Sequence, residues 1–260
     1  MLVYVDLARQ GFRRHAAYRA AAVAGLFTNT VFGCVRAYVL LAVLAAQPGL
    51  GGYDATSAVT FTFLTQALIM AFGGFGPGMD LPQRIRTGDV VVDLLRPVDF
   101  HGTWLATDLG RAVWHILARG IGPLVLGALL FGIAVPSTAG RAATFAVALV
   151  LGVVVSFSVR YLFVLVGFWM VDNRGLDMVS YGLWAFFSGL FLPLHLFPPG
   201  LRQVALVTPW AMTMQRCADA WQGRVGPGGL VLPAVWAVIL VVVGRAVTRL
   251  AVRKVVVQGG

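Results

Sequence analysis

The sequence predicts an all-α membrane protein that crosses the bilayer six times and forms one domain over residues 1–260. Of the 260 residues, 59% are hydrophobic and only 12% are charged, about half the charged share of an average soluble protein. Six apolar stretches reach the roughly 20 residues that a helix needs to cross the hydrocarbon core. This composition excludes a water-soluble enzyme and a disordered regulator, because too few charges exist to cover a surface in water.

The six apolar stretches differ in how clearly they end. The fourth is long enough to tilt, whereas prolines from Pro193 onward end the fifth abruptly and make it the weakest of the six. An even number of crossings puts both termini on the same side of the membrane. The predicted spans are Val23–Ala46, Thr56–Phe75, Val113–Val135, Ala142–Met170, Leu176–Leu194 and Gly229–Val247.

The net charge of +10 comes from nineteen Arg, one Lys and ten Asp, with no Glu. In a soluble protein this balance would indicate nucleic-acid binding, but here the cations gather in alternate segments, and we predict no nucleic-acid partner. Because basic residues favour cytoplasmic loops, we predict that both termini are cytoplasmic. The inner cations are then Arg9, Arg13, Arg14, Arg19, Arg84, Arg86, Arg96, Arg111, Arg174, Arg245, Arg249, Arg253 and Lys254, and the outer ones are Arg141, Arg202, Arg216 and Arg224.

Residues 1–20 predict a helix with two unlike sides. Asp6 and Arg9 fall on one side, and Tyr4 and Phe12 on the other. Such a helix is suited to the inner headgroup layer, although the same residues would also serve as a simple basic anchor.

Residues 195–228 predict two short outer helices before the last span. Their Trp and Met side chains would enter the outer leaflet or form an interfacial belt. Cys217 lies in this segment and Cys34 inside the first span, so we expect no disulfide between them. The four His residues are scattered, and no metal-ligand spacing is present, so we predict that this chain binds no metal.

The sequence contains no pattern typical of a catalytic site. No Gly-x-x-x-x-Gly-Lys-Ser/Thr motif occurs, so we do not expect this chain to hold a nucleotide. Asp89 and Asp93 are spaced for one helix face, but beside Arg residues they favour local ion pairs. A polytopic membrane enzyme or lipid-modifying protein is the alternative, without an evident site. An ion-coupled transporter would need carboxylates within the predicted spans and an inverted repeat, and the sequence indicates neither.

Three Arg residues fall within predicted spans. Arg119 can extend toward the inner interface and Arg36 toward the outer one. Arg160 lies about 18 Å of helix from Asp172 at the inner end, which is hard for its side chain to reach. We therefore weigh two roles for Arg160, which lies near Ser156: lining a translocation route or subunit seam, or forming a structural pair.

Residues 76–101, between the second and third predicted spans, combine glycine and proline stops with closely spaced charges. From composition alone, a solvated loop that satisfies the positive-inside rule is the simpler interpretation. The run Ile85–Pro97, however, reads IRTGDVVVDLLRP. It is similar to a signature of permease subunits of bacterial type 2 ABC exporters, and the predicted layout of the whole chain resembles theirs.

The resemblance implies that residues 76–101 form a coupling helix that docks on a separate cytoplasmic ABC ATPase, which holds ATP and Mg²⁺. This chain would then be the non-catalytic permease of an exporter in the bacterial plasma membrane, moving an amphipathic or hydrophobic compound outward. A second permease, more often a sister chain than an identical one, would pack against the first and fifth spans. The ATPase would contact Arg86, Gly88, Asp89, Asp93, Leu94, Leu95, Arg96 and Pro97, with the two Leu filling an apolar groove.

Overall fold

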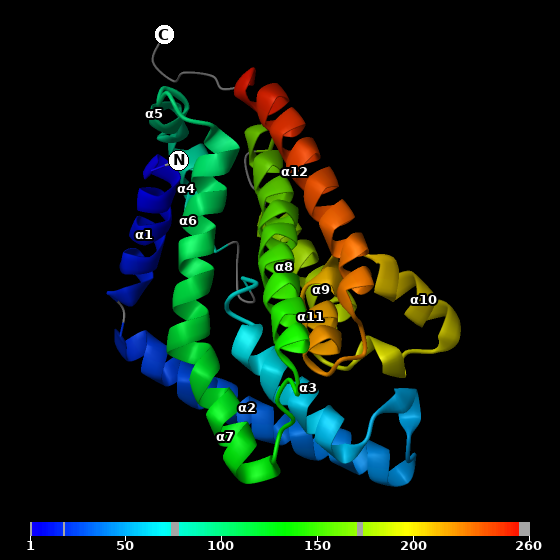
Figure 1. Cartoon of the computed structure of the whole chain (residues 1–260). Helices are drawn as coiled ribbons and strands as arrows, with labels where there is room; N and C mark the ends of the chain where they lie inside the picture. The colour runs from blue at the N-terminus through cyan, green and yellow to red at the C-terminus, as the bar shows by residue number, and fades with distance from the viewer. Residues whose placement is uncertain (1, 18, 74–77, 171–173, 255–260) are drawn as a thin grey trace.

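A computed structural model describes residues 2–17, 19–73, 78–170 and 174–254 (Figure 1). Helix makes up 80% of the structure, and the described residues contain no strand, which confirms the all-α prediction. Within these ranges, four helical stretches are long and apolar enough to cross a membrane, so the prediction of a multi-pass membrane protein is confirmed as well. These stretches are Ala22–Ala46, Phe100–Phe131, Ala139–Phe168 and Pro227–Val252.

The helices follow one another with short connections. Several are joined by 3₁₀ turns, and a π-helical turn at Ile116–Gly120 joins α6 to α7. In chain order the α-helices are α1 (Leu2–Ala16), α2 (Arg19–Ala46), α3 (Ala55–Leu68), α4 (Leu81–Thr87), α5 (Val90–Leu94), α6 (Phe100–His115), α7 (Ile121–Phe131), α8 (Ala139–Leu165), α9 (Arg174–Phe187), α10 (Pro199–Val207), α11 (Met214–Trp221) and α12 (Val231–Val252).

The helices α3 and α9 are shorter than the spans predicted for residues 56–75 and 176–194. Each has 14 residues, about 21 Å of helix, against roughly 30 Å of hydrocarbon. α3 ends before Gly73 and α9 before Gly189, and these glycines have φ angles of 74° and 86° that a right-handed helix cannot contain. Within the described residues, helix length therefore supports four crossings where we predicted six.

The helix that contains the third predicted span begins before that span does. It starts at Phe100, whereas we predicted a span from Val113. The Asp99 carboxylate accepts a hydrogen bond from the Gly102 N–H at 2.7 Å and caps the first turn. Arg111, which we counted with a cytoplasmic segment, therefore lies on a helix within the candidate span Phe100–Phe131, where it is buried.

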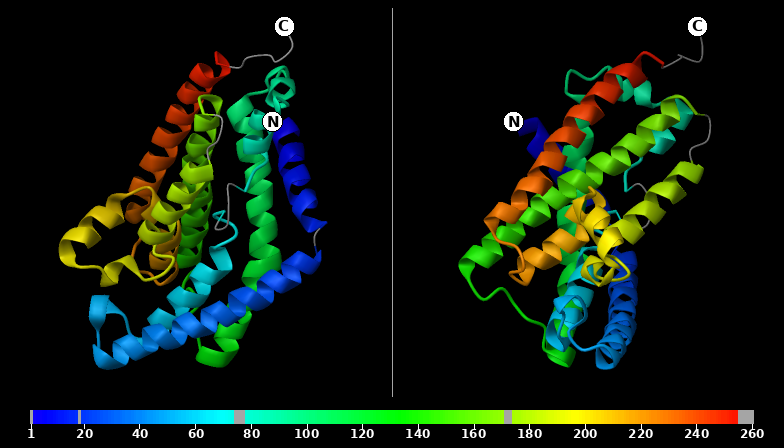
Figure 2. Two further views of the ribbon diagram at one scale, coloured as in Figure 1. Left: turned by 180° about the vertical axis from the view of Figure 1, so that it is seen from behind. Right: turned by 90° about the vertical axis from the view of Figure 1, so that its right-hand side faces the viewer.

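The long helices run alongside one another, and one end of the molecule gathers several chain segments. Figure 1 shows α6, α8 and α12 side by side, with α2 running obliquely below them, against α3 and α7. The start of α1, the short helices α4 and α5, and the end of α12 lie together at the other end (Figures 1 and 2). The segment that carries the ABC-type motif is therefore close to both ends of the described chain.

The first helix packs along α6. Its polar side stays exposed, while Phe12 packs edge to face against Trp114 with ring centroids 5.2 Å apart. Glycines permit this close approach, because a Cβ on Gly110 would overlap the carbonyl oxygen of Ala8. The amphipathic helix expected for the headgroup layer thus uses its apolar side to contact another helix of the same chain.

The helix α11 lies inside the protein, whereas we predicted that the Met and Trp side chains of this segment would enter the outer leaflet or form an interfacial belt. Met212 and Met214 are fully buried, and α11 packs against α8. Trp221 contacts Phe145 of α8 edge to face, with ring centroids 4.8 Å apart. Cys217 is a free thiol, and its burial raises its pKa.

Candidate functional site

The segment with the ABC-type motif folds into two short helices, and we call residues 80–97 the α4–α5 hairpin. α4 has Pro82 in its first turn, where a missing N–H is tolerated. Gly88 ends α4 in the left-handed conformation, with a φ angle of 81°, and α5 begins two residues later at Val90. Gly88 therefore permits the sharp turn between the two helices.

Ion pairs inside the hairpin hold α4 against α5. Asp93, whose side chain is only 10% exposed, pairs with Arg84 and, at 3.7 Å, with an Nη atom of Arg96. The Thr87 hydroxyl donates a hydrogen bond to the Asp89 carboxylate at 2.7 Å. The local ion pair expected for Asp93 is present, and it lies within the hairpin, not at its outer rim.

The inner side of the hairpin is packed against long helices. Leu81 and Val90 are buried in one cluster with Phe157 and Tyr161 of α8 and Ala251 of α12. These contacts join the hairpin to two of the four candidate spans. A displacement of the hairpin would therefore act on α8 and α12 directly.

The outer side of the hairpin exposes apolar side chains. Leu95 is 79% exposed and Val92 is 56% exposed. Leu94 instead packs against the cluster beneath the hairpin. The two Leu of the motif thus lie in different surroundings, and Leu95 is the more exposed of the two. The other exposed members of the predicted contact set are Arg86, Gly88, Asp89, Arg96 and Pro97.

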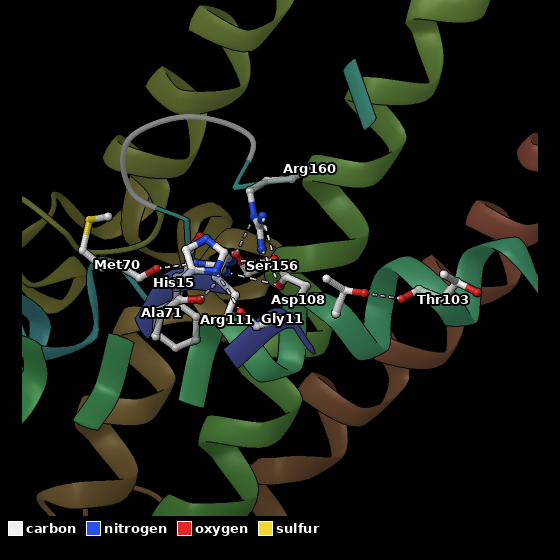
Figure 3. A network of polar contacts seen from close by, with 11 residues as sticks. Gly11, His15, Met70, Ala71, Thr103, Asp108, Arg111, Ser156 and Arg160 are labelled. Carbon is white, nitrogen blue, oxygen red and sulfur yellow. Dashed lines mark hydrogen bonds and ion pairs between the residues drawn. The ribbon is translucent and has the colours of Figure 1, made fainter. Parts of the chain in front are cut away.

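A second polar site, which we call the Asp108 network, lies within the bundle (Figure 3). Asp108 of α6 is buried and binds the guanidinium groups of Arg111, at 2.7 Å from Nε, and of Arg160 on α8, at 2.8 Å from Nη2. Second contacts of 3.2 Å and 3.3 Å make both pairs bidentate. Arg160 therefore takes part in a structural ion pair, one of the two roles considered for it.

The Asp108 network also holds the end of α3. Arg111 donates hydrogen bonds to the carbonyl oxygens of Met70, at 2.6 Å, and Ala71, at 2.8 Å. The Ser156 hydroxyl donates to the carbonyl oxygen of Phe72 at 2.7 Å. Carbonyl groups at a helix end have no helical partner, and side chains of α6 and α8 supply one here. The network thus fixes the chain just before it leads to the hairpin.

Asp108 was not among the residues that we predicted to be functional. We placed it in a loop because the stretch before Val113 is polar. Two signals could have found it. Asp99 is a good helix N-cap residue two positions after Pro97, and Asp108 and Arg111 have the i, i+3 spacing of neighbours on one helix.

Arg160 also lines a small cavity between α8 and α9. Its other lining residues include Phe163, Asp177 and Tyr181, and its volume of about 30 Å³ is large enough to hold a water molecule. Ser156 is buried in the same region. A role for Arg160 and Ser156 along a translocation route stays a prediction.

A third polar cluster joins α11 to the turn before α10. Asp219 of α11 accepts a hydrogen bond from Gln215 at 2.9 Å and lies 3.0 Å from Nε2 of His195. The Gln215 side-chain oxygen accepts the Leu194 N–H at 2.7 Å. This cluster fastens the turn before α10 to α11. Among the described residues, no group of three His, Cys or acidic side chains could hold a metal ion.

Long apolar helices, an ionic network between them and a hairpin packed on two of them define a multi-pass membrane protein with a structured element at one end. A family model described as ABC-2 family transporter protein matches residues 34–259. Because this match covers most of the chain, the protein belongs to that family, and the resemblance found from the sequence is confirmed. It is the membrane component, or permease, of an ABC transporter and is not itself catalytic. No curated protein matches the chain.

Proposed function

We propose that this permease is driven by a separate cytoplasmic ABC ATPase that docks on the α4–α5 hairpin. The observation that carries the proposal is the exposure of Leu95, a large apolar side chain beside the exposed Arg96 and Pro97. Protein interfaces commonly place such an apolar anchor in a pocket and surround it with polar contacts. The ATPase would hold ATP and Mg²⁺, and this chain would bind neither.

Closure of the ATPase on ATP would act on the bundle through two connections. The first is the packing of Leu81 and Val90 against α8 and α12. The second is the Asp108 network, which ties the end of α3, just before the hairpin, to α6 and α8. An ion pair between Arg14 of α1 and Asp80 also holds the start of the hairpin. We expect the helices to rock about the substrate path as the hairpin moves.

The proposed direction is export of an amphipathic or hydrophobic compound from the cytoplasm or the inner leaflet of the bacterial plasma membrane. A second permease, more often a sister chain, would pack on α2 and α9. The short helices α3 and α9 would then be the remaining two of six crossings. The non-helical backbone at their ends would lie within the membrane but be surrounded by protein, not lipid. The motif at residues 85–97 and the gathering of the hairpin with the start of α1 and the end of α12 support cytoplasmic termini.

The substitution Leu95→Asp is expected to abolish recovery of an ATP-hydrolysing partner with the tagged permease, because a carboxylate would enter an apolar groove unpaired. Affinity purification from membranes, followed by an ATP hydrolysis assay, measures this. Leu201→Asp is the matched control, since it changes an exposed leucine of α10 far from the hairpin, and it should leave recovery unchanged. Equal ATPase recovery with Leu95→Asp and with the wild type would count against the proposal.

A further inference from the structure

A groove of about 430 Å³ lies between α2, α3 and α9. This volume is within the range of small-molecule sites in proteins. Most of its wall is apolar or aromatic, with Phe32, Ile69 and Phe191 among the lining residues. Arg36 also lines the groove, and the same arginine lines a smaller adjoining cavity of about 100 Å³.

Arg36 brings a positive charge that the described residues do not neutralise. Its Nη1 donates a hydrogen bond to the Thr65 hydroxyl at 3.3 Å. Its Nε is buried without a hydrogen-bond partner, and among the described residues no carboxylate lies within ion-pair distance of it. We had expected the Arg36 side chain to extend to the outer interface, but it is directed to α3. A guanidinium in apolar surroundings strongly favours an anionic partner.

The buried arginines of the Asp108 network differ from Arg36 because they have a carboxylate partner within the protein. Arg111 and Arg160 share the carboxylate of Asp108, with N–O distances of 2.7 Å and 2.8 Å. The bundle thus pairs two arginines with an acid of its own, whereas Arg36 faces a groove. The missing counter-charge at Arg36 is consistent with a ligand that supplies it.

Two neutral polar side chains lie on the same wall. The Gln66 side-chain amide lines the groove and has no hydrogen-bond partner in the described part of the chain. Asn29 is buried and makes one long contact, 3.4 Å from its amide nitrogen to the Gln66 carbonyl oxygen. Both can donate hydrogen bonds to oxygens of a ligand. An acidic head group would therefore find three donors together: Arg36, Gln66 and Asn29.

We propose that the groove binds an amphipathic anion, with a carboxylate, sulfate or phosphate at Arg36 and an apolar body against Phe32, Ile69 and Phe191. This inference rests on the proposed function and narrows its substrate class from hydrophobic or amphipathic compounds to amphipathic anions. The groove lies on α2 and α9, the helices that the second permease would cover. A free amphiphile and an anionic lipid share this chemistry.

The test uses the permease purified with its ATPase and any second permease, in nanodiscs of phosphatidylcholine. Two probes share one apolar body: pyrenebutyrate carries a carboxylate and pyrenebutylammonium a cation. Arg36→Met is expected to weaken pyrenebutyrate binding by about tenfold or more. It should not weaken the binding of pyrenebutylammonium. Arg36→Lys should retain part of the affinity. Arg202→Met, which removes a cation on α10 that does not line the groove, should change neither probe.

The proposal is overturned if the wild type does not bind pyrenebutyrate, or if Arg36→Met binds it as tightly as the wild type does. Gln66→Leu provides a second variant should Arg36→Met fail to fold. It keeps the charge but removes one donor, and it should weaken pyrenebutyrate binding severalfold.

Anionic lipid as the source is tested by replacing part of the phosphatidylcholine with phosphatidylglycerol. If the lipid occupies the groove, the apparent Kd of pyrenebutyrate rises for the wild type but not for Arg36→Met. If a free amphiphile is the natural ligand, the Kd stays the same. Either result supports an anion site in the groove. The difference between the two results shows whether its ligand is an anionic lipid or a free amphiphile.

Failure of this inference and failure of the proposed function give different results. If the ATPase co-purifies but pyrenebutyrate binding does not depend on Arg36, the anion site is wrong and the ATP-driven permease stands. If no ATPase co-purifies while binding still depends on Arg36, the anion site stands and the docking proposal is wrong.

Discussion

Replacing Asp108 with alanine is expected to destabilise the protein by about 3–5 kcal/mol, the usual effect of removing one partner from a buried ion pair. The substitution would remove the carboxylate that binds both buried guanidinium groups, those of Arg111 and Arg160. It would also disturb Arg111, which holds the carbonyl groups of Met70 and Ala71. Thermal denaturation in detergent, followed by size-exclusion chromatography, measures the loss.

The chain offers a closely matched control for Asp108. Asp6 and Arg9 on α1 form another i, i+3 pair, but both side chains are more than half exposed. Asp6→Ala should change stability by no more than about 0.5 kcal/mol, because water screens this pair. Adding Arg160→Leu to Asp108→Ala should restore part of the loss, because it removes one of the two buried guanidinium groups that Asp108 binds. A melting temperature for Asp108→Ala equal to that of Asp6→Ala would refute the structural role of the network.

The substitution Gly110→Ala should detach α1 from α6 or destabilise the protein by several kcal/mol. The added methyl group would overlap the Ala8 carbonyl oxygen, and backbone cannot move aside as a flexible side chain can. Overpacking of a tight contact commonly costs about 1–3 kcal/mol, and backbone displacement adds to that. Melting temperature reports the loss, and the fluorescence of Trp114, which packs against Phe12 of α1, reports the separation of the helices.

Gly182→Ala is the control for Gly110→Ala. Gly182 lies within α9, and a Cβ there would meet nothing within 4 Å. Alanine favours helix over glycine by about 1 kcal/mol, so this variant should be slightly more stable than the wild type. If Gly110→Ala were as stable as Gly182→Ala, α1 would not cross α6 as closely as described.

Hydropathy and the motif were enough to predict the long apolar helices and to locate the hairpin. Long apolar runs predicted α2, α8 and α12 within a few residues of their observed ends, because lipid-facing helices need apolar side chains along most of their length. The start of α6 was missed because Asp108 and Arg111 looked like loop residues. Only the fold brings Arg160 from α8 to pair with Asp108, and a contact between residues 52 positions apart leaves no local pattern.

The motif located the hairpin but did not show which of its side chains face outward. α5 has five residues, too few for a periodic pattern to distinguish its faces. Asp93 and Leu94 therefore looked equivalent to Leu95 as docking residues, although Asp93 pairs with Arg84 of α4 and Leu94 packs on the cluster shared with α8 and α12. In the same way, the direction of the Arg36 side chain depends on Thr65 of α3 and on the groove beside it.

The central claim, that a separate ATPase docks on the α4–α5 hairpin, is tested most directly by photo-crosslinking in intact membranes. A photoreactive amino acid is placed at residue 95, and at residue 201 of α10 as the control. The account predicts an adduct between residue 95 and a protein that carries a nucleotide-binding ATPase domain, with no such adduct from residue 201. If residue 95 forms no adduct with an ATPase while the protein is inserted and folded, the account is contradicted.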